Sequence, residues 1–218
     1  MKTVAFLHTA DAHISTFDTL FEGADPDVAR THRAHPEWLS EAREAGLTED
    51  LRKRVADILI EQASTADAVL CTCSTIGPIA DDVSATHKNV FRIDRPLMEK
   101  AADHNGKIIV AICVESTLKP TIDLLSEVFA EKAKTLEPVI ARCNAAWPHF
   151  WSGEREQFCQ IIAAEVKRVY ADTDNPGCVV LAQASMAVAA PFLSDLPIPV
   201  YGSPDAALET ILQSLNTE

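Results

Sequence analysis

A cysteine followed by two hydroxylic residues comes directly after a short apolar segment in the first half of the chain. Cys73 precedes Ser74 and Thr75 in the segment AVLCTCSTIG, residues 68–77. Successive backbone N–H groups and hydroxyls stand here just before Pro78, a residue suited to the first turn of a helix. Donors grouped in this way bind a carboxylate and favour the thiolate form of a nearby cysteine. The residue types therefore predict thiol chemistry on a small anionic substrate.

A second segment of the same kind lies in the other half of the chain, with one chemical difference. Residues 178–187, CVVLAQASMA, again pass from apolar residues to small and hydroxylic ones. Gln183 stands where the first segment has its cysteine, and Ser185 supplies a hydroxyl. An amide side chain both donates and accepts hydrogen bonds, yet it has no accessible pKa for proton transfer. We expect the two segments to adopt similar structures with different chemical capacities.

Apolar segments of strand length alternate with amphipathic segments of helix length along the whole sequence. The predicted strands cover residues 3–8, 29–34, a segment ending at 71–73, 89–93, 107–114, 139–142, 178–183 and 198–201. The predicted helices cover residues 36–46, 48–64, 94–105, 120–134, 154–171 and 205–215, with a short amphipathic stretch at 17–21. Such alternation is typical of α/β proteins with parallel sheets. We predict two pseudo-symmetric Rossmann-like α/β lobes with a site in the cleft between them. The first lobe comprises residues 1–103 with a helix over 203–218, and the second comprises residues 104–202.

The composition is that of an acidic protein with a sizeable core. The chain has 218 residues, 47% of them hydrophobic, and a formal net charge of -13. An acidic exterior repels nucleic acid and anionic membranes, so we expect neither as a partner. The N-terminal segment turns polar too early for a secretory signal, and no apolar run reaches membrane-spanning length. We expect a cytoplasmic protein whose six cysteines are reduced thiols, most of them in the core.

Common cofactor and metal motifs are absent or incomplete. The sequence contains no glycine motif of a dinucleotide-binding site, a phosphate loop or a serine hydrolase. Asp11 and His13 resemble the opening of a metallophosphoesterase metal site, but the later G-D and G-N-H segments are missing. Cys71 and Cys73 have no second closely spaced Cys or His pair that could complete a zinc site. We therefore expect neither a metal nor an organic cofactor.

Three segments together resemble the aspartate/glutamate/hydantoin racemase superfamily. Residues 73–75, CST, resemble the C-N-T element of these proteins, and residues 181–187, LAQASMA, resemble the L-G-C-A-G-M-A element of hydantoin racemases. Residues 200–204, VYGSP, lead into a final helix in the same order. The resemblance covers nearly the whole chain and implies two pseudo-symmetric lobes around a cofactor-free site. It matches Cys73 to the first catalytic cysteine and Gln183 to the position of the second.

The resemblance implies proton transfer at the carbon next to a carboxylate, with one thiol fewer than the racemases use. In those enzymes one thiolate removes a proton and a second thiol delivers one from the opposite face, while backbone and hydroxyl donors hold the carboxylate. Gln183 cannot perform the second step, which leaves three outcomes. Another group supplies the second proton, Cys73 alone protonates one face after a bond is broken, or Cys73 acts as a nucleophile.

Two members of the superfamily illustrate these outcomes. Arylmalonate decarboxylase works with one cysteine, and maleate isomerase uses covalent attack by cysteine. We expect a cofactor-independent enzyme of racemase or isomerase type that acts on a small carboxylate through a single thiol. The alternatives are a single-cysteine decarboxylase and a small-carboxylate-binding protein that has lost catalysis. The resemblance alone suggests a homodimer or larger homo-oligomer.

Residues at the ends of other predicted strands are candidates for the same site. His8 follows the first strand and could titrate near neutrality, which makes it a candidate catalytic residue. A hydrolase with Cys73 as nucleophile and His8 as base is therefore a further alternative. Arg92 and Arg95 could supply positive charge, or could instead form surface ion pairs with acidic neighbours. The candidate ligands of the substrate carboxylate are the hydroxyls of Ser74, Thr75, Ser116, Thr117 and Ser185.

Overall fold

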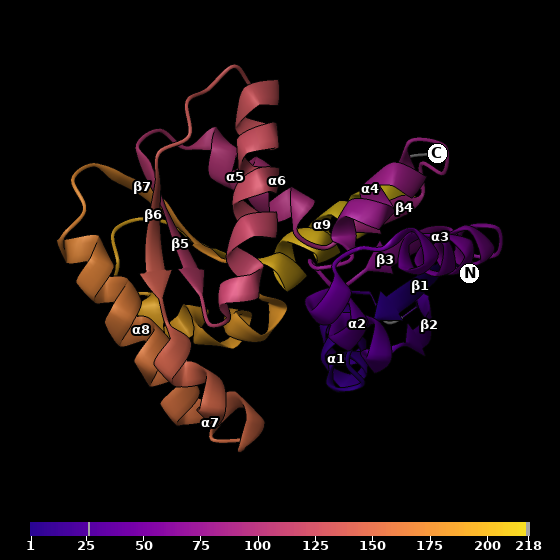
Figure 1. The fold of residues 1–218 in the computed structure, drawn as a ribbon, viewed down its shortest axis with the longest axis horizontal. Helices are drawn as coiled ribbons and strands as arrows, with labels where there is room; N and C mark the ends of the chain where they lie inside the picture. Colours follow the sequence, from indigo (N-terminus) through magenta and orange to yellow (C-terminus); the bar gives the residue numbers. More distant parts are fainter. Residues whose placement is uncertain (26, 217–218) are drawn as a thin grey trace. The chain divides into compact units, whose positions relative to one another are not determined.

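The computed structural model describes residues 1–25 and 27–216, and the chain divides into two compact units. The first unit contains Met1–Ile93 and the chain from Ala207 onward, and the second contains Asp94–Ala206. Within the described residues, each unit holds one four-stranded parallel sheet flanked by helices (Figure 1). The predicted α/β class with two parallel sheets is confirmed.

The sheet of the first unit has the strand order β2-β1-β3-β4. Its strands are β1 (Thr3–His8), β2 (Ala29–Ala34), β3 (Ala68–Cys71) and β4 (Val90–Arg92). The inner strands β1 and β3 are almost entirely buried, as expected where helices cover both faces of a parallel sheet. Leu7 lies beside Cys71 in their register, so β1 and β3 end at the same edge. The segments that follow these two strands therefore begin next to each other.

Helices connect these strands and bury the sheet. They are α1 (Ala12–Ala24), α2 (Pro36–Ala45), α3 (Glu49–Ala63) and α4 (Gly77–Ser84), and α9 (Ser203–Asn216) returns to this unit from Ala207 onward. The hydroxyl of Thr48 accepts a hydrogen bond from the backbone N–H of Leu51 at 3.2 Å, which caps α3 at its predicted start. Val55 and Leu59 then lie in a core shared with Leu7 of β1.

The sheet of the second unit has the strand order β6-β5-β7-β8, which repeats the order of the first. Its strands are β5 (Lys107–Ile112), β6 (Pro138–Arg142), β7 (Pro176–Leu181) and β8 (Val200–Gly202). Along β5, Ile109 and Ala111 belong to one hydrophobic core. The alternate residues Ile108 and Val110 belong to another, so this sheet too is buried on both faces.

The helices of the second unit begin before its first strand. They are α5 (Arg95–Asp103), α6 (Leu118–Glu131), α7 (Trp147–Trp151) and α8 (Arg155–Ala171), with 3-10 segments η1 (Glu115–Thr117), η2 (Asn144–Ala146) and η3 (Ala184–Leu193). Leu97 and Ala101 of α5 pack in the same core as Ile108 of β5. The second unit therefore begins at Asp94, ten residues before the start at 104 that the sequence suggested. No helix within the described ranges is long and apolar enough to cross a bilayer.

Some element ends differ from the sequence-based expectation. The strands predicted to end at residues 114 and 183 end at Ile112 and Leu181, because the apolar pattern continues past the last ladder pair. The short helix α7 lies in a stretch for which no helix was predicted. The segment after β7 forms the 3-10 helix η3, and Pro191 inside it opposes a regular α-helix.

Two glycines, one just before β5 and one at the start of β7, allow the chain at these two places to approach closely. Gly106 has a φ of 95°, and a Cβ on it would lie 2.3 Å from the carbonyl oxygen of Asn175. A Cβ on Gly177 would lie 2.3 Å from the carbonyl oxygen of Asn105. A side chain at either position would clash with backbone. The two inner strands of the second sheet thus start side by side.

Candidate functional site

Cys73 lies in the turn between β3 and α4, half-buried against the core of the first unit. β3 ends at Cys71, and α4 begins at Gly77. The carbonyl oxygen of Cys73 accepts a weak contact from the thiol of Cys71 at 3.9 Å. The other five cysteines are buried, so Cys73 has the most accessible thiol of the chain.

Hydrogen-bond donors next to Cys73 are not used within the structure. The backbone N–H of Thr72 donates to Leu7 at 3.0 Å, and that of Gly77 donates to Ser74 at 3.3 Å. Between them, no described residue accepts a hydrogen bond from the backbone N–H groups of residues 74–76. The side chains of Ser74 and Thr75 are half-buried in the same turn. This turn can therefore donate hydrogen bonds to an anion beside the thiol.

His8 is fully buried at the end of β1 and belongs to a chain of hydrogen bonds. Its Nδ1 lies 2.8 Å from Oγ1 of Thr72, the residue before Cys73. Its Nε2 lies 2.9 Å from Nδ1 of His32 on β2. Nε2 of His32 lies 3.1 Å from a carboxylate oxygen of Asp18 on α1. Both nitrogens of His8 are thus engaged with side chains other than Cys73.

The expectation that His8 titrates near neutrality is wrong. Burial, followed by the neighbouring His32 and His13, lowers the pKa of His8 to about 3, although Asp18 opposes the shift. The ring is therefore neutral at physiological pH. Since neither of its nitrogens is free, the geometry does not support His8 as the base of a cysteine hydrolase.

Gln183 follows β7 by two residues and is half-buried, like Cys73 after β3. Its Oε1 accepts hydrogen bonds from the backbone N–H groups of Cys113 at 2.7 Å and Val114 at 3.2 Å. These two donors directly follow β5. The carbonyl oxygen of the side chain thus sits where an anion oxygen could bind. The amide N–H groups of Gln183 donate to no residue that the structure describes, so they remain available as donors.

The other candidate hydroxyls of the second unit lie near the carboxyl ends of β5 and β7. Ser185 is half-buried in η3. Ser116 and Thr117 lie in η1, where Ser116 is exposed and Thr117 is half-buried. In the same segment, Glu115 forms an ion pair with Arg142 at 3.4 Å. The half-buried hydroxyls are therefore better protected from water than that of Ser116.

The two candidate arginines are held in ion pairs. Arg92 is buried and pairs with Asp81 of α4 at 2.5 Å. Its guanidinium packs so closely on Gly77 that a Cβ there would lie 3.0 Å from Nε. Arg95 pairs with Glu127 and Glu131 of α6, the latter at 3.3 Å. Both side chains thus have structural roles within their own units.

Most remaining cysteines are core residues. Burial raises the pKa of Cys143 to about 12 and that of Cys178 to about 12, and it also raises that of Cys113. Their thiols are therefore protonated at physiological pH. No cluster of three or more His, Cys, Asp or Glu side chains within the described part of the chain is arranged to hold a metal ion.

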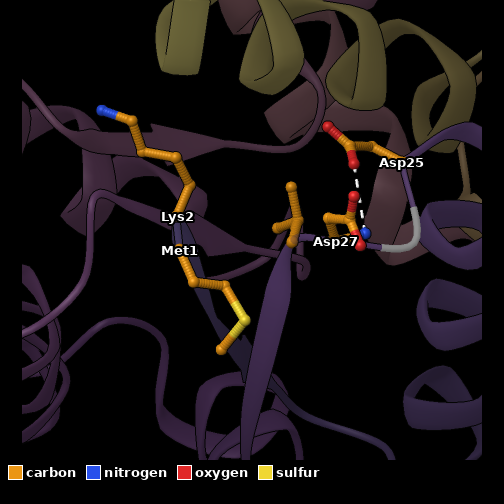
Figure 2. A pocket seen from close by; sticks show the side chains of 5 residues that line it. Met1, Lys2, Asp25 and Asp27 are labelled. Carbon is orange, nitrogen blue, oxygen red and sulfur yellow. Dashed lines mark hydrogen bonds between the residues drawn. The ribbon is translucent and has the colours of Figure 1, made fainter.

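A surface pocket lies at the opposite edge of the first sheet (Figure 2). Met1 and Lys2, which precede β1, line it together with Val28, which precedes β2. Asp25 and Asp27 complete the lining, and the backbone N–H of Asp27 donates to the Asp25 carboxylate at 3.2 Å. In parallel α/β sheets, ligands bind at the carboxyl ends of the strands. We therefore do not assign this pocket to the chemistry of Cys73.

Sequence reasoning missed the partners that surround the candidate residues. Thr72 and His32 reach His8 only through the register of β1, β2 and β3, and Asp18 of α1 bonds in turn to His32. The donors that hold Gln183 are backbone groups of Cys113 and Val114, which no residue type reveals. A histidine in the middle of a strand, such as His32, was the one available signal.

Comparisons with known proteins identify the fold. No protein-family profile and no curated protein matches the sequence. The aspartate racemase of Picrophilus torridus is 14% identical with a TM-score of 0.67, and the match covers 98% of this chain and 94% of that one. The allantoin racemase of Klebsiella pneumoniae is 14% identical with a TM-score of 0.67, covering 99% and 88%. Unliganded arylmalonate decarboxylase is 11% identical with a TM-score of 0.58, covering 100% and 94%. Identities this low establish a fold and not an activity. The chain therefore shares the fold of these racemases and of arylmalonate decarboxylase, as the resemblance of its sequence predicts.

Proposed function

We propose that the protein is a cofactor-independent enzyme that transfers a proton at the carbon next to a carboxylate, with Cys73 as its reactive thiol. The observation that carries this proposal is the half-buried Cys73 beside the backbone N–H groups of residues 74–76, which no described residue uses. The fold shared with racemases and with arylmalonate decarboxylase supports this class of reaction. The substrate is a small carboxylate, and the reaction is of racemase or isomerase type.

In the proposed reaction the thiol removes the proton, and the neighbouring donors stabilise the charge that forms. The Cys73 thiolate takes the proton, so that the carbon–hydrogen bond breaks and a sulfur–hydrogen bond forms. The electron pair moves into the carboxylate, whose oxygens gain negative charge. The N–H groups of residues 74–76, with the hydroxyls of Ser74 and Thr75, bind these oxygens and stabilise that charge. Donors already fixed in a turn need little reorganisation during this step.

Gln183 limits what the second unit can contribute. Its amide exchanges no proton, but its N–H groups can donate to the substrate because its oxygen is held by Cys113 and Val114. The hydroxyls of Ser185, Thr117 and Ser116 are further proposed ligands of the carboxylate. Loss of a second thiol at Gln183 favours decarboxylation as the second candidate. There Cys73 protonates one face of the carbanion after carbon dioxide leaves.

Substrates can be found with a panel of small 2-substituted carboxylic acids and malonates in deuterated water. Proton NMR detects deuterium at the α-carbon and loss of carbon dioxide, and with a chiral shift reagent it also detects inversion of configuration. We expect Cys73→Ala to lower turnover of the identified substrate by roughly 100-fold or more, since it removes the proton-transfer group. Cys159→Ala is the matched control, because Cys159 is a buried core residue of the second unit. Full turnover by Cys73→Ala would contradict the proposal.

A binding protein without activity gives a different result in the same experiment. It binds small carboxylates but turns none of them over, and alkylation of Cys73 leaves its affinity unchanged. Alkylation with iodoacetamide addresses this residue selectively because the other thiols are buried. Rapid turnover that alkylation abolishes would rule this alternative out.

A further inference from the structure

His13 differs from the other histidines in the hydrogen bonding of its ring nitrogens. The chain has seven histidines, and six of them form side-chain hydrogen bonds: His8, His32, His35, His87, His104 and His149. Neither ring nitrogen of His13 bonds to any residue of the described ranges. The side chain is nevertheless half-buried, in the first turn of α1. A half-buried imidazole with both nitrogens free is available to a ligand.

Stacking and packing contacts of the ring hold the His13 side chain in place, and hydrogen bonds to its nitrogens do not. The ring stacks on that of His8 with centroids 6.3 Å apart and an interplanar angle of 16°. It also packs against Phe17 at 6.5 Å. Its backbone N–H donates to Ala10 at 3.1 Å, which holds the turn after β1. The ring is therefore oriented while its nitrogens stay free on its edge.

His13 and Cys73 follow neighbouring strands at the same edge of one sheet. β1 pairs with β3, and Leu7 lies beside Cys71 where the two strands end. The ring of His13 stacks on that of His8, and Nδ1 of His8 lies 2.8 Å from Oγ1 of Thr72. Thr72 directly precedes Cys73. A thiol and an imidazole thus start from adjacent strand ends within the first unit.

The surroundings of His13 keep its imidazole neutral. Burial lowers the pKa of His13 below its usual value. The neighbouring ring of His8 is neutral as well, and behind it lie His32 and Asp18, with Arg30 paired to Asp18 at 3.2 Å. A neutral imidazole accepts a proton at physiological pH.

We propose that His13 is the second proton-transfer group of the site and replaces the thiol that is missing at Gln183. This inference rests on the function proposed above. In one direction the imidazole of His13 takes the α-proton and becomes imidazolium, while the thiol of Cys73 gives its proton to the same carbon. One carbon–hydrogen bond breaks, another forms on the opposite face, and a thiolate remains. In the reverse direction this thiolate takes the proton and the imidazolium gives its own.

The two groups can be separated by following exchange and inversion of each enantiomer in deuterated water. His13→Gln lowers inversion roughly 100-fold, the usual contribution of a general acid or base. The enantiomer whose α-proton Cys73 removes still exchanges at a rate within about threefold of the wild-type rate. In a second variant, His13→Ala, added imidazole restores inversion. Cys73→Ser shows the reciprocal pattern, in which only the other enantiomer exchanges. His35→Gln is the matched control, because His35 follows the neighbouring strand β2 but its ring bonds to Glu37 at 2.9 Å.

Each outcome of this experiment decides a different question. If His13→Gln inverts the substrate at the wild-type rate, His13 is not the second proton-transfer group. The same holds if the variant loses inversion and the exchange of both enantiomers equally. Either result leaves the proposed function of Cys73 standing. Full turnover by a Cys73 variant, or a wild-type protein that turns over no substrate, overturns the proposed function. Reciprocal loss in the two variants, with His35→Gln unchanged, supports the pair.

Discussion

The segments after β3 and after β7 both leave an inner strand of a parallel sheet, and they differ in what occupies the nearby backbone donors. In the first unit the N–H groups of residues 74–76 have no acceptor among the described residues, and Cys73 stands beside them. In the second unit the N–H groups of Cys113 and Val114 bind the side-chain oxygen of Gln183. The same strand order thus supports an open donor cluster in one unit and an internally satisfied one in the other. A repeated scaffold can therefore keep backbone donors open to a ligand in one half and use them for its own stability in the other.

The ends of β1 and β5 extend this comparison to buried polar groups. β1 ends in His8, which is fully buried and bonded to two side chains. β5 ends in apolar residues, and the next residue is the buried Cys113. A buried imidazole links the stability of the first unit to pH, whereas β5 ends in Ile112, whose side chain does not titrate.

Acid should therefore weaken the first unit through His8, and this is the largest effect we expect. The pKa of His8 is about 3 in the folded protein and about 6.5 when unfolded, so the unfolded chain binds more protons between these values. The stabilisation that neutral His8 gives the folded state is fully present above pH 6.5 and is lost as the pH falls towards 3, about 5 kcal/mol in all. Urea unfolding at several pH values measures it, with His8→Gln as the comparison.

The variant His8→Gln isolates this effect from the titration of carboxylates. Glutamine can hydrogen-bond in the same surroundings but does not ionise. We expect the variant to be less stable than the wild type at pH 7 and the gap to narrow on acidification. Parallel pH profiles for the two proteins would show that His8 is not linked to acid unfolding.

Removal of the Gln183 side chain should leave the backbone donors after β5 without an acceptor, like those after β3. Gln183→Ala leaves the N–H groups of Cys113 and Val114 without their acceptor and costs about 2 kcal/mol of unfolding free energy. Added acetate should bind these donors and raise the melting temperature of the variant more than that of the wild type. Gln183→Glu is the matched control, because its carboxylate keeps an acceptor oxygen in place. An acetate response that is the same in all three proteins would mean that the donors do not form an anion site.

The sequence predicts the scaffold well because buried parallel strands are continuous apolar segments. Residues 3–8 are such a segment, were predicted as a strand and match β1. The more polar residues 29–34 were also predicted as a strand and match the half-buried β2. The predicted strand ends at Cys73 and Gln183 are two residues late, since side-chain hydrophobicity does not show where a ladder ends.

The surroundings of the candidate site were less accessible to sequence reasoning. His8 was placed correctly at a strand end, but its neutrality depends on burial and on neighbours such as His32, which lies 24 residues away in sequence. Such contacts are set by strand register, and a single sequence does not determine register. The oxygen of Gln183 is held by backbone groups, which are the same for every residue type. Burial and pairing therefore had to come from the structure.

A half-buried hydroxyl should bind the substrate carboxylate more strongly than an exposed one, and this is the smallest effect we expect. Ser74 is half-buried beside unused donors, whereas Ser116 is exposed in η1. If the function proposed above holds, a hydrogen bond from Ser74 to a carboxylate contributes about 1.5 kcal/mol, and Ser74→Ala raises KM about tenfold. Water can replace the hydroxyl of Ser116, so Ser116→Ala should change KM less than about twofold. Steady-state kinetics of the two variants measures both values. Equal increases in KM would show that the second edge binds the carboxylate as strongly as the first, and the asymmetry of the two edges would then lie in the thiol alone.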